Sequence, residues 1–104
     1  MSTLFATRWL EVEPGWGDRP EGFKVFKDRN DCEATTKKDS EIGHYEGGGG
    51  YCGPVRPLVF YEIVLEEFED SVQENIKVNG AAFTSNHWKP KKTLRQYTID
   101  QENT

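Results

Sequence analysis

No apolar run in the 104-residue sequence approaches the roughly 20 residues that a membrane-spanning helix needs. Cysteine is scarce as well, because Cys32 and Cys52 are the only two, and this excludes a framework of several disulfides. Basic residues are outnumbered, with 13 Lys and Arg against 18 Asp and Glu and a net charge of −5. Membrane-spanning proteins, disulfide scaffolds and proteins that bind duplex DNA by bulk charge are therefore disfavoured classes.

Aromatic residues, by contrast, make up 12% of the sequence, which a disordered acidic tail would lack. The length suits one domain, expected over residues 1–99 with a frayed tail over 100–104. A domain of this size buries only about 65% of its unfolded surface, so we expect a homo-oligomer. Residues 1–12 lack the basic start and apolar core of a secretory signal, and we expect a soluble cytoplasmic protein with reduced thiols.

The first half of the sequence predicts a hairpin followed by a helix. Alternating apolar residues predict strands over Thr3–Glu13 and Phe23–Lys27. Between them Trp16–Gly22 predicts a structured turn, with the indole packed on the sheet and the Arg19 side chain held by a carboxylate or a carbonyl. An N-cap at Asp28 and the absence of Gly and Pro then predict a helix over residues 29–42.

In the second half, Leu58–Leu65 has seven apolar or aromatic residues in eight and predicts a central strand buried on both faces. A second helix is expected over Glu66–Lys77, ended by Asn79-Gly80. Two further strands, Ala81–Trp88 and Thr93–Ile99, are expected to join across the intervening basic residues. The predicted order β-β-α-β-α-β-β indicates an α+β fold with two helices on one side of a small, mainly antiparallel sheet.

The segment Trp16–Phe23 (WGDRPEGF) leads from one strand to the next through an Arg-Pro-acid-Gly turn. Together with the acid-capped helix and the Arg56-Pro57 pair before a later strand, it resembles small uncharacterised phage and prophage proteins. The resemblance covers about half of the chain. It implies a viral or mobile-element origin and no defined activity.

Residues 44–57 hold five Gly and two Pro, and we expect a loop there. Its backbone N–H groups can line an anion site, to which Tyr51 adds a stacking ring and Arg56 a forked cation. No Gly-Lys-Ser/Thr follows the glycines, so this is not a P-loop, and a flexible linker is the alternative. The ligand-binding residues predicted here are Gly47, Gly48, Gly49, Gly50, Tyr51 and Arg56.

A basic, aromatic segment follows at residues 86–95, where cations alternate with rings and no acid occurs. Such a segment can hold a phosphate and stack a base, and its alternative role is to protect a sheet edge. The ligand-binding residues predicted in it are Trp88, Lys89, Lys91 and Lys92. They are expected to converge with Arg56 and the glycines on one small anionic ligand.

Other chemistry has weaker signals. Cys32, His44, Cys52 and His87 are zinc-ligand types, but no pair of them has the spacing of a zinc module, so neither a metal nor a cofactor is predicted. No motif of a catalytic site occurs, and no catalytic residue is predicted. Six acids without an intervening base form a solvated face or a patch that docks on a basic partner: Glu62, Glu66, Glu67, Glu69, Asp70 and Glu74.

These observations favour a non-enzymatic phage-type binding protein that counteracts a host defence system. It would sequester a small nucleotide signal or dock on a host protein. One alternative is a small hydrolase or transferase acting on nucleotides, with His44 or His87 as general base. A structural or assembly subunit of a phage is the other.

Overall fold

A computed structural model describes residues 3–43, 49–85, 87–92 and 94–99 of the chain. Its helices are α1 (Arg29–Ile42), the short 3-10 helix η1 (Leu65–Glu67) and α2 (Asp70–Asn79). Its strands are β1 (Thr3–Glu13), β2 (Gly17–Phe26), β3 (Tyr51–Pro54), β4 (Val59–Val64), β5 (Ala81–Phe83) and β6 (Arg95–Thr98). The predicted α+β class is confirmed.

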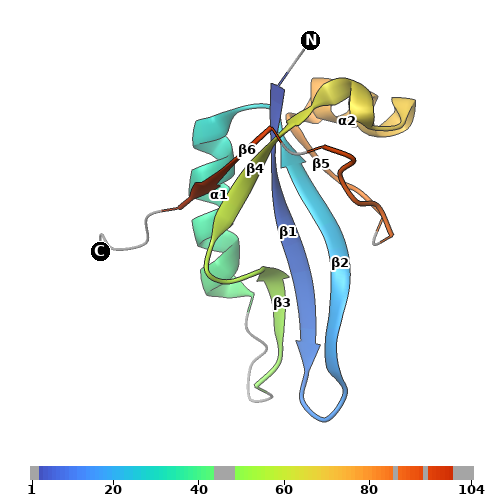
Figure 1. Cartoon of the computed structure of the whole chain (residues 1–104). Helices are drawn as coiled ribbons and strands as arrows, with labels where there is room; N and C mark the ends of the chain where they lie inside the picture. Colours follow the sequence, from blue (N-terminus) through green and yellow to red (C-terminus); the bar gives the residue numbers. More distant parts are fainter. Residues whose placement is uncertain (1–2, 44–48, 86, 93, 100–104) are drawn as a thin grey trace.

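All six strands belong to one antiparallel sheet. Five of them follow the order β5-β2-β1-β4-β6, and β3 pairs with β1 outside this order. The long strand β1 lies at the centre of the sheet, and β2 pairs along one edge of β1. The other edge of β1 is shared, because β4 pairs with Thr3–Ala6 and β3 pairs with Trp9–Val12 (Figure 1). Two partners thus divide the length of one strand.

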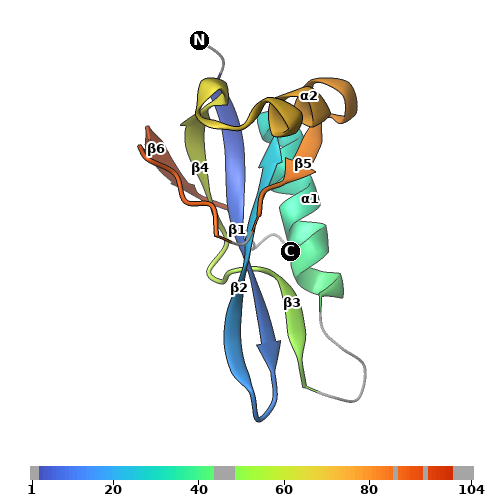
Figure 2. The same ribbon diagram turned by 90° about the vertical axis from the view of Figure 1, so that its right-hand side faces the viewer.

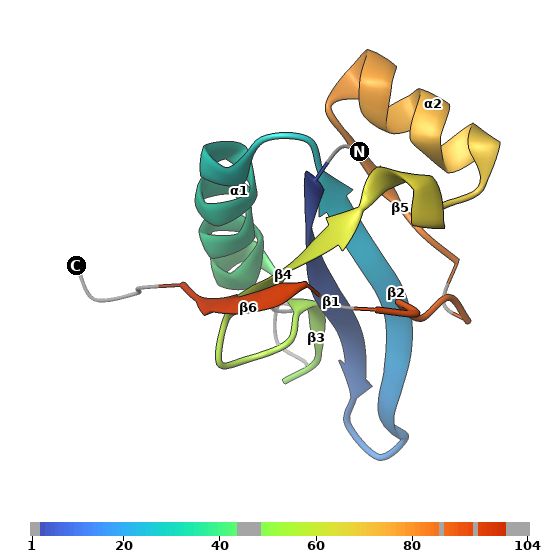
Figure 3. The same ribbon diagram turned by 45° about the horizontal axis from the view of Figure 1, so that its top comes forward.

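The helices pack on opposite faces of the sheet, and the expectation that they share one side is wrong. Leu4 and Ala6 of β1 belong to the apolar cluster that contains Ile76 of α2, whereas Phe5 packs against the cluster of Cys32 of α1. Neighbouring residues of a strand point to opposite faces, so β1 presents apolar side chains on both sides and each side needs a cover. Figure 3 shows β1 and β2 passing between α1 and α2.

The predicted helices are confirmed with adjusted bounds. The helix α1 covers the predicted residues, and the Asp28 carboxylate accepts a hydrogen bond from the Asp31 N–H at 2.9 Å. The predicted second helix is divided, since η1 precedes α2, which begins only at Asp70. Gly80 ends α2 in the left-handed conformation at φ 84°, and its N–H donates to the Ile76 carbonyl.

The strand β4 lies in the interior of the sheet between β1 and β6, as predicted, but its burial differs from the prediction. Phe60 and Ile63 are buried, whereas Tyr61 and Glu62 are half-buried. A sheet partner on each edge is thus compatible with side chains that remain partly open to solvent. We show below that Tyr61 lines a pocket.

The predicted hairpin of the last two strands is wrong. The strand β5 pairs with β2 and β6 pairs with β4, so the two strands lie at opposite edges of the sheet. Residues 84–85 and 87–92 lie outside the strands, which are shorter than predicted. The strand β3 lies within the segment that was expected to be a loop, because Tyr51–Pro54 finds its partner in distant β1.

The predicted turn at Trp16–Gly22 is largely strand, because β2 begins at Gly17 and the turn is confined to residues 14–16. The Trp16 side chain is 85% exposed, so the expectation that it packs on the sheet is wrong. A side chain at the tip of a hairpin has no neighbouring strand to cover it. Arg19 is held by carboxylates as predicted, with its Nη2 at 2.7 Å from Oε1 of both Glu11 and Glu13.

Candidate ligand-binding pocket

The chain after β5 crosses close over β2, and Gly22 makes this approach possible. Gly22 has φ 97°, and a Cβ there would lie 2.8 Å from the Ser85 carbonyl oxygen. The next residues are tied by two hydrogen bonds: the Thr84 N–H donates to the Phe23 carbonyl at 2.9 Å, and the Phe23 N–H donates to the Thr84 hydroxyl at 3.0 Å. Only glycine combines this backbone angle with so short a contact.

Further along, the same segment is fixed above the sheet by stacking. The Trp88 indole stacks on Phe68 with 4.7 Å between ring centroids, and its edge meets Phe23 at 5.2 Å. The Lys91 N–H donates to the Glu67 carboxylate of η1. Residues 87–91 therefore form a wall whose position is set by β2, by η1 and by the turn that follows η1.

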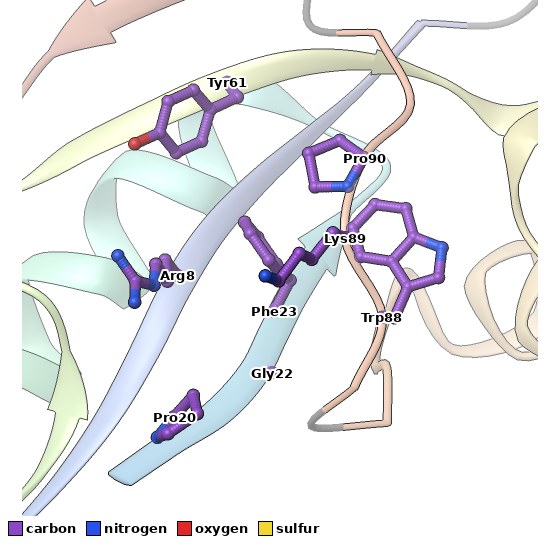
Figure 4. A pocket seen from close by; sticks show the side chains of 8 residues that line it. All are labelled: Arg8, Pro20, Gly22, Phe23, Tyr61, Trp88, Lys89 and Pro90. Atoms are coloured by element: carbon purple, nitrogen blue, oxygen red, sulfur yellow. The ribbon is translucent and has the colours of Figure 1, made fainter. Parts of the chain in front are cut away.

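A pocket of about 520 Å³ opens between this wall and the sheet (Figure 4). It is lined by Arg8, Pro20, Gly22, Phe23, Tyr61, Trp88, Lys89 and Pro90. In Figure 4 Trp88 and Pro90 stand on one side, Tyr61 stands across from them, and Phe23 lies between. We call this the aromatic pocket; its volume is in the usual range of small-molecule sites.

The aromatic pocket carries positive charge, because Arg8 and Lys89 are the only charged residues among the described residues that line it. Both side chains are exposed, and within the described ranges neither one has an ion pair or a hydrogen bond. Figure 4 shows the Lys89 side chain extending from the wall across β2. Three rings with two cations suit a ligand that has a flat apolar part and an anionic part.

Two of the predicted site residues, Trp88 and Lys89, line the aromatic pocket. Lys91 and Lys92 are exposed and are not among its lining residues. The prediction that Lys91 and Lys92 line the same site as Trp88 and Lys89 is therefore not met in this pocket, although Lys91 lies in the wall and Lys92 follows it in sequence.

The described residues of the predicted glycine segment do not line the aromatic pocket. Gly47 and Gly48 fall outside the described residues, Gly49 is exposed with φ 74°, and Gly50 is buried. The Tyr51 hydroxyl donates to the Pro54 carbonyl at 2.6 Å.

Arg56 is bonded to helix α1 rather than to the aromatic pocket. Its Nε donates to the Ser40 hydroxyl at 2.9 Å and its Nη2 to the Ser40 carbonyl at 2.8 Å. Its guanidinium carbon lies 5.4 Å from the centre of the Tyr51 ring. The structure thus brings Arg56 together with Tyr51, but it does not bring either residue into one pocket with Trp88 and Lys89.

The sequence patterns did not indicate Pro90 of the wall, nor the part of the aromatic pocket that the sheet provides, namely Arg8, Pro20, Gly22, Phe23 and Tyr61. For Arg8, the sequence does contain a pattern that indicates a functional residue. It interrupts a row of alternating apolar residues on β1, and a cation on such a face is expected to have a purpose. The other strand residues have no local signal, because β1, β2 and β4 meet only in the folded sheet.

No group of three or more His, Cys, Asp or Glu side chains in the described ranges is arranged to hold a metal ion. No disulfide joins Cys32 and Cys52, and burial raises the pKa of the Cys32 thiol to about 12. The described part of the chain has no helix that is both long and apolar enough to cross a bilayer.

No protein-family model, curated protein or solved structure matches this chain. The chemistry of the aromatic pocket is therefore the starting point for a function. Its most specific feature is the pairing of exposed Arg8 and Lys89 with the rings of Phe23, Tyr61 and Trp88.

Proposed function

We propose that this protein is a non-enzymatic binding protein that captures a nucleotide in the aromatic pocket. One observation carries the proposal: two exposed cations, Arg8 and Lys89, flank a pocket walled by three aromatic rings. A nucleotide has a flat base for the rings and a phosphate for the cations. The volume of about 520 Å³ admits a ligand of this size.

The energies are sufficient for useful affinity. Charge-assisted hydrogen bonds contribute about 1.5–3 kcal/mol each, and stacking of a base on a ring contributes about 1–3 kcal/mol. Two such bonds and one stacked base together approach the roughly 8 kcal/mol of micromolar binding. The wall is already held by Trp88 on Phe68, so little ordering is required when the ligand enters.

Binding without turnover is supported by the composition of the lining. Of the described residues that line the aromatic pocket, none carries a carboxylate, an imidazole or a thiol that would activate water. His87 immediately precedes Trp88, but it is exposed and does not line the aromatic pocket.

The resemblance to phage proteins suggests a setting for this capture. We propose that the protein acts in the host cytoplasm and lowers the concentration of a nucleotide signal on which a host defence system depends. Assembly into a homo-oligomer belongs to the same proposal, and native mass spectrometry of protein purified from cells reports the oligomer and any retained ligand together.

Calorimetric titration with a panel of purine and pyrimidine nucleotides tests the proposal. At least one nucleotide should bind, and Arg8→Ala should weaken its binding at least tenfold, or about 1.4 kcal/mol. The matched control is Lys38→Ala, which removes an exposed cation from α1, outside the lining of the aromatic pocket. Absence of heat with every nucleotide from a folded protein would refute nucleotide capture and favour docking on a host protein. Appearance of a hydrolysed product by NMR would refute binding without turnover.

A further inference from the structure

A second, smaller pocket of about 200 Å³ lies beside the aromatic pocket. Its lining consists of Leu10, Tyr51, Val55 and Arg56. We call it the side pocket. It combines two aliphatic side chains with one aromatic ring and one guanidinium, which is again a surface for a flat group with a polar edge.

The two pockets are neighbours along β1. Arg8 lines the aromatic pocket and Leu10 lines the side pocket, and two positions on a strand are about 6.8 Å apart, with the shift in the β1–β2 register lying between Trp9 and Leu10. Across the hairpin, Leu10 pairs with Pro20, which lines the aromatic pocket. On the other edge, the N–H of Val55 donates to the Arg8 carbonyl at 2.8 Å.

Arg8 therefore stands between the two pockets. Figure 4 shows its guanidinium directed away from Phe23 and from Trp88, so that it is not folded into the aromatic pocket. A cation at this point can contact a phosphate that links one group in the aromatic pocket to another in the side pocket.

The side pocket is also preorganised. The Arg56 guanidinium is fixed by its two hydrogen bonds to Ser40 and lies over the Tyr51 ring, whose hydroxyl is bonded to the Pro54 carbonyl. A planar guanidinium held in this way offers its face or edge to a base without losing further side-chain freedom.

We propose that the ligand is a dinucleotide, with one nucleoside in the aromatic pocket, the second in the side pocket and the linking phosphate at Arg8. This inference rests on the proposed capture of a nucleotide and specifies its class. A linear and a cyclic dinucleotide share the required chemistry, and the experiment includes both. The acidic net charge of the chain favours a ligand with one or two phosphates over a long polyanion.

The test compares the affinities of AMP, linear pApA and cyclic di-AMP, and of the guanine counterparts, by calorimetry. At least one dinucleotide should bind ten times more tightly than the corresponding mononucleotide. Leu10→Trp should fill the side pocket, abolish this advantage and leave mononucleotide affinity within twofold. Val78→Trp adds the same bulk at an exposed position of α2 and should change neither affinity.

The outcomes separate the two proposals. A mononucleotide that binds as tightly as every dinucleotide overturns the side-pocket inference and leaves nucleotide capture intact. Failure of all the nucleotides to bind overturns both. If Leu10→Trp does not fold, Val55→Phe replaces it, because it also fills the side pocket and adds no charge near the phosphate at Arg8. An unchanged dinucleotide advantage in a folded variant contradicts the inference.

Discussion

The two halves of strand β1 have different surroundings although they form one continuous strand. In the half that pairs with β4, Leu4 and Ala6 are at most 2% exposed, and Thr7, the next residue in the strand, is 1% exposed. In the half that pairs with β3, every residue from Trp9 to Glu13 is half-buried, and the β2 residues Gly17–Pro20, which pair with Leu10–Glu13, are exposed. Figure 2 shows the β1–β2 hairpin continuing past both helices, with β3 beside it.

This difference separates two kinds of stabilisation. The first half is covered on both faces by apolar clusters, so burial of hydrophobic area stabilises it. The second half depends on strand pairing and on exposed ion pairs from Arg19 to Glu11 and Glu13, which contribute little. Arg8 lies at the boundary, where a cation stays exposed while the rings beside it are anchored in the core. A binding site needs both an accessible charged group and rings that are held in a fixed position.

The two cysteines provide the sharpest contrast, because Cys32 lies on the buried face of α1 and Cys52 lies in β3. Burial raises the pKa of the Cys32 thiol from its ordinary 9.0 to about 12, so its thiolate fraction at neutral pH falls roughly a thousandfold. We expect iodoacetamide to alkylate Cys52 alone in the native protein, and both thiols after unfolding, as measured by peptide mass spectrometry. Equal native rates would show that the cover of Cys32 opens readily.

The core itself is tested at Phe60, which is 1% exposed and packs in the cluster with Cys32. Phe60→Ala should lower the free energy of unfolding by about 3–5 kcal/mol, because it removes buried area and leaves a cavity. The matched control is Phe83→Ala, since Phe83 is 49% exposed at the edge near Trp9. Denaturant unfolding measures both, and similar losses would contradict the division of the molecule into two differently stabilised parts.

Substitution of Gly22 tests whether the close crossing of the chain over β2 sets the position of the pocket wall. Gly22→Ala should lower the free energy of unfolding by about 1–3 kcal/mol because of the positive φ at this position. The clash of the added Cβ with the Ser85 carbonyl should lower it further. The control is Gly15→Ala, which has a similar φ of 84° but nothing within 4 Å of the added Cβ. Only Gly22→Ala should also weaken nucleotide binding, because it displaces the segment that carries Trp88 and Lys89. Equal effects of the two changes would mean that the close crossing over β2 is unimportant.

Sequence patterns predicted the parts of this molecule that depend on neighbours in the chain. The bounds of α1, the N-cap at Asp28 and the end of α2 at Gly80 follow from local signals and are confirmed. The strand β3 and the separation of β5 from β6 depend on pairing with β1, β2 and β4, which no local pattern specifies. The candidate site divides in the same way: Trp88 and Lys89 are adjacent in sequence, whereas Arg8, Phe23 and Tyr61 meet them only through the sheet.

The smallest stability effect is expected at the tip of the hairpin. Trp16 is 85% exposed, so Trp16→Ala removes almost no buried area and should change the free energy of unfolding by less than about 0.5 kcal/mol. A large exposed indole is nevertheless typical of residues that anchor protein interfaces. Thermal unfolding measured over a range of protein concentrations distinguishes the two roles. If Tm depends on concentration in the wild type and not in Trp16→Ala, the tip is an oligomer contact; a loss of several degrees at every concentration would instead show that the indole packs within its own chain.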